Sequence, residues 1–277
     1  MGSYARPSTL AEALNLMAPG DKRLLAGGTD LYPGAGTALS GDILDLTAVA
    51  GLSGLEPTAE GGVRIGACTT WTAIAEADLP PAFDALRAAA RQVGGRQIQN
   101  AGTIGGNLCN ASPAADGVPP LLALDARAEL VSPRGTRLLP LADFITGPRK
   151  VALDRDEALA AVLIPAPALA GRSAFVKLGA RAYLVISIAM VAARIVTEAG
   201  RVREAAVAVG ACSAVARRLP AVEAALQGAR PAEAAERIVP ADVAAALAPI
   251  DDVRASAAYR AGAATELVRR AVTEALA

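Results

Sequence analysis

Residues 101–108 are Ala-Gly-Thr-Ile-Gly-Gly-Asn-Leu, and residues 24–31 are Leu-Leu-Ala-Gly-Gly-Thr-Asp-Leu. Both stretches place a Gly-Gly pair beside residues with polar side chains. Glycine permits positive φ and close approach of a ligand to the backbone, and successive free N–H groups form a concave anion site. Neither stretch matches the Gly-x-Gly-x-x-Gly fingerprint or a P-loop. Each alone fits an ordinary turn, and the two together are compatible with a phosphate-bearing ligand.

The composition bounds the class of protein. The chain has 277 residues, 53% of them hydrophobic, which is enough for two or three domains with buried cores. Lys+Arg and Asp+Glu each total 27, so no basic excess indicates a nucleic acid partner. We expect no membrane span, because no run of about 18 apolar residues occurs. The cysteines Cys68, Cys109 and Cys212 are odd in number and far apart, which favours a reducing cytoplasm.

The chain has no histidine. A Ser-His-Asp triad, a Cys-His dyad and the common zinc sites are therefore excluded. There is also no Cys-x-x-Cys pair, so the sequence predicts no iron–sulfur cluster held by this chain alone. We predict no catalytic side-chain set and no metal site, and we expect either a borrowed organic cofactor or a purely binding role.

The pattern of apolar residues and turn residues predicts alternating helices and strands. A βαβ-like start, a middle with the glycine-rich passage 98–110, and a Pro-rich boundary at 165–172 precede a second set of strands. The expected helices are 8–19, 70–77, 80–93, 121–125 and the alanine- and arginine-rich 221–277. The expected strands are 23–26, 42–46, 63–67, 128–132, 160–164, 174–177, 185–193 and 205–211.

Four ordered segments carry a family resemblance that covers nearly the whole chain. They are AGGTDL at 26–31, NAGTIGGNLCNASPAAD at 100–116, Phe175–Lys177 with Arg181 and Ile186–Ile188, and DVRASAAYR at 252–260. Together they resemble the FAD-binding subunit of molybdenum hydroxylases. That family includes the medium subunit of aerobic carbon monoxide dehydrogenases and the flavin domain of xanthine dehydrogenases. A single Gly-Gly-Thr or Gly-Gly-Asn is weak evidence for the family, whereas four matching segments in the family's order are specific evidence.

The resemblance implies an α+β fold with two domains. A two-subdomain FAD-binding PCMH-type domain is expected over residues 1–168, with subdomains of about 1–54 and 55–168. A smaller α+β domain, with an antiparallel sheet plus helices, is expected over 172–277. This second domain is similar to the C-terminal domain of carbon monoxide dehydrogenase flavoproteins.

The resemblance also implies cofactor-binding residues. Two segments are expected to wrap the FAD pyrophosphate and ribitol: Leu24, Leu25, Ala26, Gly27, Gly28, Thr29, Asp30 and Leu31, and Thr103, Ile104, Gly105, Gly106 and Asn107. By the same resemblance, the remaining contacts are Val93 beside the cofactor, Asp116 as a hydrogen-bond partner, Leu159 at the adenine, Lys177 near the flavin ring and Ile186 over it. A cation at Lys177 would stabilise the anionic reduced flavin.

Alternatives stay open for several of these residues. Asp30 and Asp116 also fit turn caps, Leu159 fits plain core, and Lys177 fits a surface lysine at a strand end. The aromatic residues Trp71, Tyr32 and Tyr183 either border a ligand or pack half-buried.

In the family interpretation, substrate is oxidised at a molybdopterin cofactor in a large subunit. Electrons pass through [2Fe-2S] clusters of a small subunit to FAD in this chain, and then to quinone, oxygen or NAD. The expected assembly is a cytoplasmic heterotrimer. A stand-alone FAD-dependent oxidase of the same fold is the alternative enzyme, and the lack of histidine argues against it. A scaffold that has lost its flavin is the non-enzymatic alternative, and the intact glycines of both loops argue against it.

Overall fold

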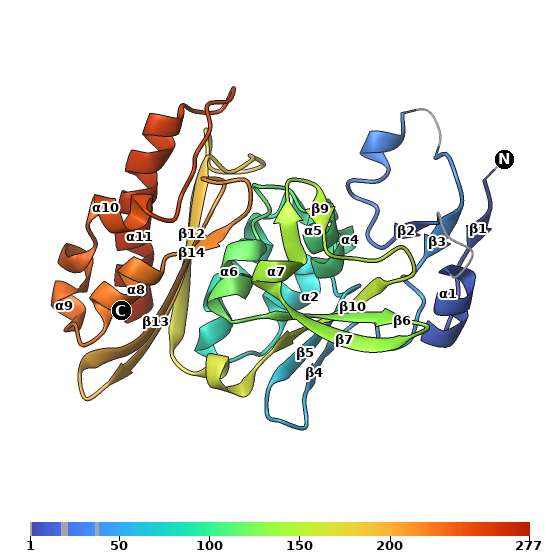
Figure 1. The fold of residues 1–277 in the computed structure, drawn as a ribbon, viewed down its shortest axis with the longest axis horizontal. Coiled ribbons are helices and arrows are strands. Elements are labelled where there is room, and N and C mark those ends of the chain that lie inside the picture. The colour runs from blue at the N-terminus through green and yellow to red at the C-terminus, as the bar shows by residue number, and fades with distance from the viewer. Residues whose placement is uncertain (1, 18–21, 37–38) are drawn as a thin grey trace.

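The computed structural model describes residues 2–17, 22–36 and 39–277. Its fold is α+β, as expected, and three lobes follow one another along the molecule (Figure 1). The N-terminal lobe lies at one end, a central body carries most of the helices, and the C-terminal domain lies at the other end. None of the helices in the described ranges is both long and apolar enough to cross a membrane.

The N-terminal lobe is a small parallel sheet of order β1-β3-β2, which confirms the βαβ-like start. Thr9 and Glu12 explain where its helix begins. The Thr9 hydroxyl accepts from the Glu12 N–H, and the Glu12 carboxylate accepts from the Ser8 N–H at 3.0 Å, a pattern typical of a capped helix start. The elements are β1 (Tyr4–Ala5), α1 (Leu10–Met17), β2 (Arg23–Leu25), the 3-10 turn η1 (Pro33–Ala35) and β3 (Ile43–Asp45).

The central body is an antiparallel sheet of order β4-β5-β10-β6-β7 with helices packed on it. Its core contains Ile65, Leu108, Leu121 and Val162, all fully buried. The strands are β4 (Leu55–Pro57), β5 (Val63–Gly66), β6 (Arg127–Ser132), β7 (Gly135–Pro140) and β10 (Ala158–Ile164), with the hairpin β8 (Ile145–Gly147) and β9 (Lys150–Val151). The helices are α2 (Trp71–Glu76), η2 (Pro81–Phe83), α3 (Asp84–Gln92), α4 (Arg96–Ala101), α5 (Ile104–Asn110), α6 (Val118–Ala123), α7 (Leu141–Phe144) and η3 (Ala166–Leu169).

The glycine-rich passage 98–110 differs from the expectation, because it forms two helices rather than a loop. Thr103 caps α5 by accepting from the Gly106 N–H. A Cβ at Gly105 would lie 2.6 Å from the Ala67 carbonyl oxygen, so helix and strand end pack too closely for any side chain. Glycine is a poor helix former, so the sequence pattern of this passage does not predict a helix.

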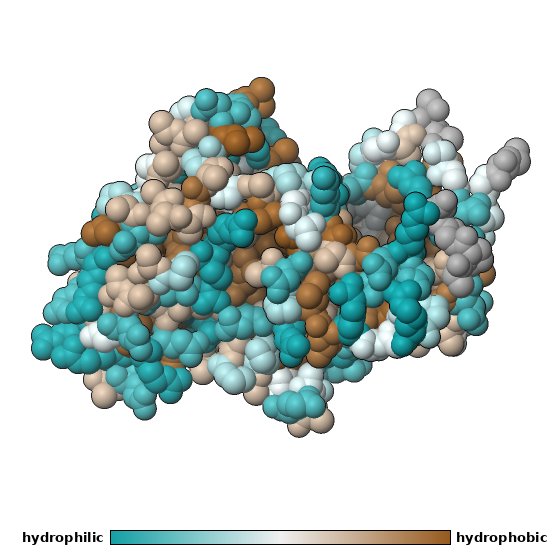
Figure 2. Space-filling model, viewed as in Figure 1, coloured by the Kyte–Doolittle hydropathy of each residue, from teal (hydrophilic) through white to brown (hydrophobic). Residues whose placement is uncertain are grey.

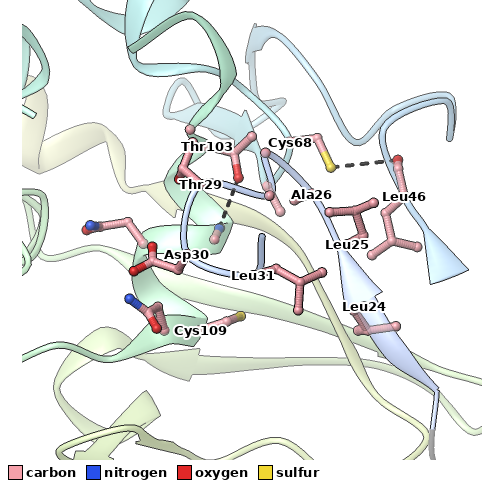
Figure 3. Close-up of a pocket in the computed structure, with 18 of the residues that line it drawn as sticks. Leu24, Leu25, Ala26, Thr29, Asp30, Leu31, Leu46, Cys68, Thr103 and Cys109 are labelled. Atoms are coloured by element: carbon pink, nitrogen blue, oxygen red, sulfur yellow. Dashed lines mark hydrogen bonds between the residues drawn. The ribbon is translucent and has the colours of Figure 1, made fainter. Parts of the chain in front are cut away.

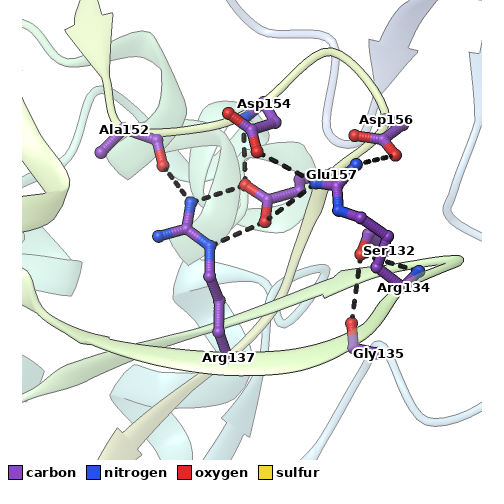
Figure 4. A network of polar contacts seen from close by, with 8 residues as sticks. All are labelled: Ser132, Arg134, Gly135, Arg137, Ala152, Asp154, Asp156 and Glu157. Carbon is purple, nitrogen blue, oxygen red and sulfur yellow. Dashed lines mark hydrogen bonds and ion pairs between the residues drawn. The ribbon is translucent and has the colours of Figure 1, made fainter.

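A polar network ties the β6–β7 hairpin to the loop that precedes β10 (Figure 4). The buried carboxylate of Glu157 pairs with Arg137 at 2.6 Å and accepts from the Asp154 N–H at 2.9 Å. Arg134 pairs with Asp154 and with Asp156. Glu157 comes two residues before Leu159, so the network fixes the entry of the chain into β10.

The C-terminal domain is an antiparallel sheet of order β11-β12-β13-β14 covered by helices. The continuous helix expected over 221–277 is wrong. Pro220, Pro231 and Pro240 each start a separate short helix, since proline fits the first helical turn and not the interior. The elements are β11 (Arg172–Leu178), β12 (Ala189–Glu198), β13 (Arg201–Gly210), β14 (Arg217–Arg218), α8 (Pro220–Leu226), α9 (Pro231–Ala234), η4 (Ala235–Arg237), α10 (Pro240–Ala244) and α11 (Ala257–Leu276).

The two domains contact each other through packed helices and strands and through charged side chains. Helices α3 and α6 pack on β11 and on β12 and β13. The buried guanidinium of Arg194 donates to the Ala123 carbonyl at the end of α6 and pairs with Asp125 and Glu204. Cations at a helix C-terminus satisfy its free carbonyls, so these contacts orient one domain on the other. The domain limits expected at 168 and 172, and near residue 54, stay predictions.

Candidate functional site

A cavity of about 550 Å³ opens between the N-terminal lobe and the central body. The turn that carries Thr29, Asp30 and Leu31 faces Thr103 and Cys109 across it (Figure 3). The volume lies within the range of about 300–1,000 Å³ typical of small-molecule and cofactor sites. In Figure 2, hydrophobic residues gather in the recesses between the lobes, while polar residues cover the rims.

The first glycine segment forms one wall as the chain leaves β2. Gly28 has φ 70°, a conformation that favours glycine. A Cβ at Gly27 would lie 2.0 Å from the Ala101 carbonyl oxygen, so the segment touches the end of α4. Within the described residues, the N–H groups from Gly27 to Leu31 make no hydrogen bond. They are therefore available to an anion, as the sequence suggested.

The backbone N–H groups of the second glycine segment are not free, unlike those of the first. Its first N–H groups are already bonded inside the protein: that of Ile104 to Thr69, that of Gly105 to Ala67 at 2.8 Å, and those of Gly106 and Asn107 to Thr103. The interpretation of this segment as a row of free amides is wrong, because the carbonyls of Thr69 and Ala67 accept from the first two N–H groups, and the cap and first turn of α5 accept from the next two. The segment offers instead a glycine-lined wall that permits close approach of a ligand.

One polar atom of the cavity is orphaned. The Oδ1 atom of Asn107 is buried and has no hydrogen-bond partner among the described residues. An unsatisfied buried acceptor costs about 1–3 kcal/mol, a cost that a ligand donor would remove. Because Asn107 lines the cavity, this unpaired acceptor lies beside the space that a ligand would fill.

The cavity also contains residues that the site prediction missed. Cys68 and Cys109 line it, and burial raises the pKa of their thiols to about 11 and about 12, so both remain protonated, apolar wall groups. The Cys68 thiol donates to the Leu46 carbonyl at 3.7 Å. Cys109 lies one helical turn after Gly105, and recognition of α5 as a helix would have placed it on the same face. The other missed lining residues are Arg23, Leu46, Ala67, Ile98, Gly102 and Asn110.

The structure gathers most of the predicted cofactor-binding residues around this cavity. Those that line it are Leu24, Leu25, Ala26, Gly27, Gly28, Thr29, Asp30, Leu31, Val93, Thr103, Gly105, Gly106, Asn107 and Leu159. Of the three aromatic residues considered, Trp71 lines it, whereas Tyr32 and Tyr183 do not. Because these predicted cofactor-binding residues line one cavity, the simplest interpretation is that they bind one common ligand.

Four predicted residues lie outside the lining. Ile104 is fully buried in the central core on the inner side of α5. Ile186 is 64% exposed in the segment before β12. Asp116 and Lys177 form a buried ion pair of 2.6 Å just behind the cavity. The surface-lysine alternative for Lys177 is therefore wrong.

The ion pair sits at the boundary between the domains. Asp116 accepts from Lys177 and from the Ser187 hydroxyl, both at 2.6 Å. Burial raises the pKa of Asp116, while the charge of Lys177 and the hydrogen bonds from Lys177 and Ser187 oppose that rise. Within the described residues, no group of three His, Cys, Asp or Glu side chains is arranged to hold a metal ion.

Comparisons with known proteins identify the family. Residues 1–167 match the FAD binding domain in molybdopterin dehydrogenase, and residues 174–275 match the CO dehydrogenase flavoprotein C-terminal domain. The chain is 36% identical to the xanthine dehydrogenase FAD-binding subunit of Escherichia coli O157:H7, over 99% of this chain and 96% of that protein. It is 31% identical to the nicotine 6-hydroxylase medium subunit of Paenarthrobacter nicotinovorans, over 98% and 96%.

The fold agrees with this assignment. A chain in the structure of reconstituted CO dehydrogenase from Oligotropha carboxidovorans superposes with a TM-score of 0.90 at 29% identity, covering 100% of this chain and 98% of that one. The resemblance noted from the four sequence segments is confirmed. The chain therefore belongs to the FAD-binding, or medium, subunits of the molybdenum hydroxylase family of oxidoreductases, whose cofactor is FAD.

Proposed function

We propose that this chain holds FAD in the cavity between the N-terminal lobe and the central body. As the flavoprotein subunit of a heteromeric molybdenum hydroxylase, it receives electrons from [2Fe-2S] clusters of a small subunit. It passes them to an external acceptor, which is a quinone, oxygen or NAD. Substrate oxidation takes place at a molybdopterin cofactor in a large subunit, and we place the heterotrimer in the cytoplasm.

The observation that carries the proposal is the pairing of free backbone N–H groups at 27–31 with a glycine-lined wall opposite. The N–H groups suit a pyrophosphate, and the glycines Gly105 and Gly106 leave room for the cofactor against α5. The orphaned Oδ1 of Asn107 can accept from a hydroxyl or N–H of the cofactor. The cavity volume of about 550 Å³ favours FAD over a simple phosphate, which would fill only a small part of it.

The bound flavin would supply the redox chemistry, since it exchanges single electrons and stores two. The residues of this chain bind, orient and shield it. Leu159, Val93 and the two protonated thiols give the cavity apolar walls that exclude water. Asp116 and Lys177 lie behind the wall as an ion pair with no net charge. We propose that the pair affects the flavin ring through the placement of its two charges.

Co-purification with partner subunits tests the proposal. The tagged chain, expressed with the genes adjacent to its own, is expected to elute in a complex that contains iron, molybdenum and FAD. In that complex the flavin should bleach when the oxidisable substrate is added without oxygen. The isolated chain should show no bleaching with the same substrate, because it carries no substrate site of its own.

The stand-alone oxidase is the competing function. It predicts that the chain elutes alone and that a small substrate bleaches its flavin directly. Either result in the same experiment would replace the subunit proposal.

A further inference from the structure

Three buried side chains from the two domains meet behind the cavity wall. Ser187 is fully buried, and its hydroxyl donates to Oδ1 of Asp116 at 2.6 Å. The Lys177 ammonium donates to the other oxygen, Oδ2, at 2.6 Å. Asp116 belongs to the loop before α6, whereas Lys177 lies on β11 and Ser187 precedes β12. One carboxylate is thus held at both oxygens by the C-terminal domain.

The residue after this aspartate, Gly117, packs against two residues of the cavity wall. At Gly117 a Cβ would lie 2.5 Å from the Trp71 ring and 3.0 Å from Oδ1 of Asn107, and both residues line the cavity. The Lys177 ammonium also donates to the Gln92 carbonyl at 3.4 Å, directly before the lining residue Val93. A displacement of Asp116 would therefore move Gly117 against Trp71 and Asn107.

Ser187 is itself fixed by the segment 252–260. The Arg254 guanidinium donates to the Ser187 carbonyl at 3.0 Å and pairs with Asp252 at 2.5 Å. The buried Arg260 donates to the Ile188 carbonyl at 2.5 Å and pairs with the same Asp252 at 2.6 Å. A continuous chain of charged hydrogen bonds runs from the start of α11 to Asp116.

We infer that Ser187 is a positioning residue for the flavin site, and that it acts through Asp116 on the wall formed by Trp71 and Asn107. The inference rests on the proposed function, because the ligand of that wall is taken to be FAD. Arg254 holds Ser187 in place by donating to its carbonyl. Ser187 does not line the cavity, so its influence is indirect.

The decisive variant is Ser187→Ala, which leaves Oδ1 of Asp116 without its donor. The carboxylate then reorients towards Lys177, and the wall loses its fixed position. Loss of a hydrogen bond to a charged group corresponds to about a tenfold or larger change in an equilibrium constant. We expect the Kd for FAD to rise about tenfold and the visible spectrum of bound flavin to change, with Ser187→Thr restoring both because it keeps the hydroxyl.

Ser173→Ala is the matched control. Ser173 is also buried in the C-terminal domain, on β11, and its hydroxyl donates to the Ala82 carbonyl at 2.7 Å and accepts from the Ala85 N–H at 2.8 Å. These bonds cross the same domain boundary but do not reach the cavity lining. We expect Ser173→Ala to leave FAD affinity and the flavin spectrum unchanged.

Titration of FAD into the flavin-free chain, followed by emission of Trp71, the single tryptophan, measures the affinity. Wild-type affinity and spectrum in Ser187→Ala, or equal losses in both alanine variants, would overturn the inference. Should Ser187→Ala fail to fold, Arg254→Ala removes the contact with the Ser187 carbonyl, and a wild-type Kd there would also overturn it. Should the wild-type chain bind no FAD, the proposed function fails, whereas Trp71 emission of the flavin-free variants still tests the link from Ser187 to the wall.

Discussion

The ammonium of Lys177 lies 2.6 Å from the carboxylate of Asp116, so the charge of this lysine is neutralised by a partner from the other domain. The sequence resemblance implied a lysine whose charge stabilises the reduced flavin. In the structure that charge is balanced by the Asp116 carboxylate. The potential of the bound flavin should therefore depend on Asp116 as much as on Lys177.

Asp116→Asn is expected to make the midpoint potential of bound FAD more positive. The variant keeps the shape of the side chain but leaves the Lys177 charge unbalanced, which favours added electrons. A unit charge about 10 Å away changes their energy by about 1–2 kcal/mol at an effective dielectric constant of about 20. Lys177→Met should shift the potential in the opposite direction. Redox titration against a reference dye measures both, and equal potentials in the three proteins would contradict the account.

Gly27→Ala is expected to abolish tight FAD binding. Its Cβ would meet the Ala101 carbonyl at 2.0 Å, so the two glycine segments must move apart, at a cost of about 1–3 kcal/mol. Gly34→Ala is the matched control, because a Cβ at Gly34 meets no atom within 4 Å. Calorimetric titration with FAD should separate the two variants. Wild-type affinity in Gly27→Ala would show that the close approach of the segments does not form the site.

Glu157→Gln is expected to reduce stability at neutral pH by about 1–3 kcal/mol, because it removes a charged partner from Arg137 and from the Asp154 N–H. The hydrogen bond from Arg137 holds the pKa of Glu157 below its usual value. The ionised carboxylate therefore contributes stability above the usual pKa of about 4.3, and that contribution is lost as pH falls through the folded-state pKa.

Urea unfolding at neutral and acidic pH measures this effect. The free-energy difference between wild type and Glu157→Gln should shrink as the solution is acidified below about pH 4. A difference that stays constant with pH would show that the network of Figure 4 contributes through shape alone.

The sequence predicted the turn at the first glycine segment, because residues such as Gly27, Gly28 and Thr29 carry local conformational signals. The same local reasoning failed for α5, where Gly105 and Gly106 lower helix propensity. There, the close contact with Ala67 leaves room only for glycine inside the helix, and this tertiary contact cannot be seen in the local sequence. Six strands escaped prediction: β1, β4, β7, β8, β9 and β14. Five of them have only two or three residues, too few to show an alternating pattern, and β7 lies at the sheet edge and is mostly exposed.

Long-range pairs were beyond the sequence pattern for a different reason. Asp116 and Ser187 are 71 residues apart, and Arg194 reaches the end of α6 from a similar separation. Nothing in periodicity or turn chemistry matches one charged residue to another across a domain boundary. The resemblance placed Asp116 and Lys177 near the cofactor but did not join them to each other or to Ser187.

The most direct test of the central claim is the absorption spectrum of the purified chain, followed by identification of the flavin released on heating. The account predicts the two visible bands of oxidised flavin, release of FAD without proteolysis, and loss of the bands in Gly27→Ala but not in Gly34→Ala. A colourless protein that also fails to bind added FAD would contradict it, and the cavity would then belong to a chain that has lost its flavin.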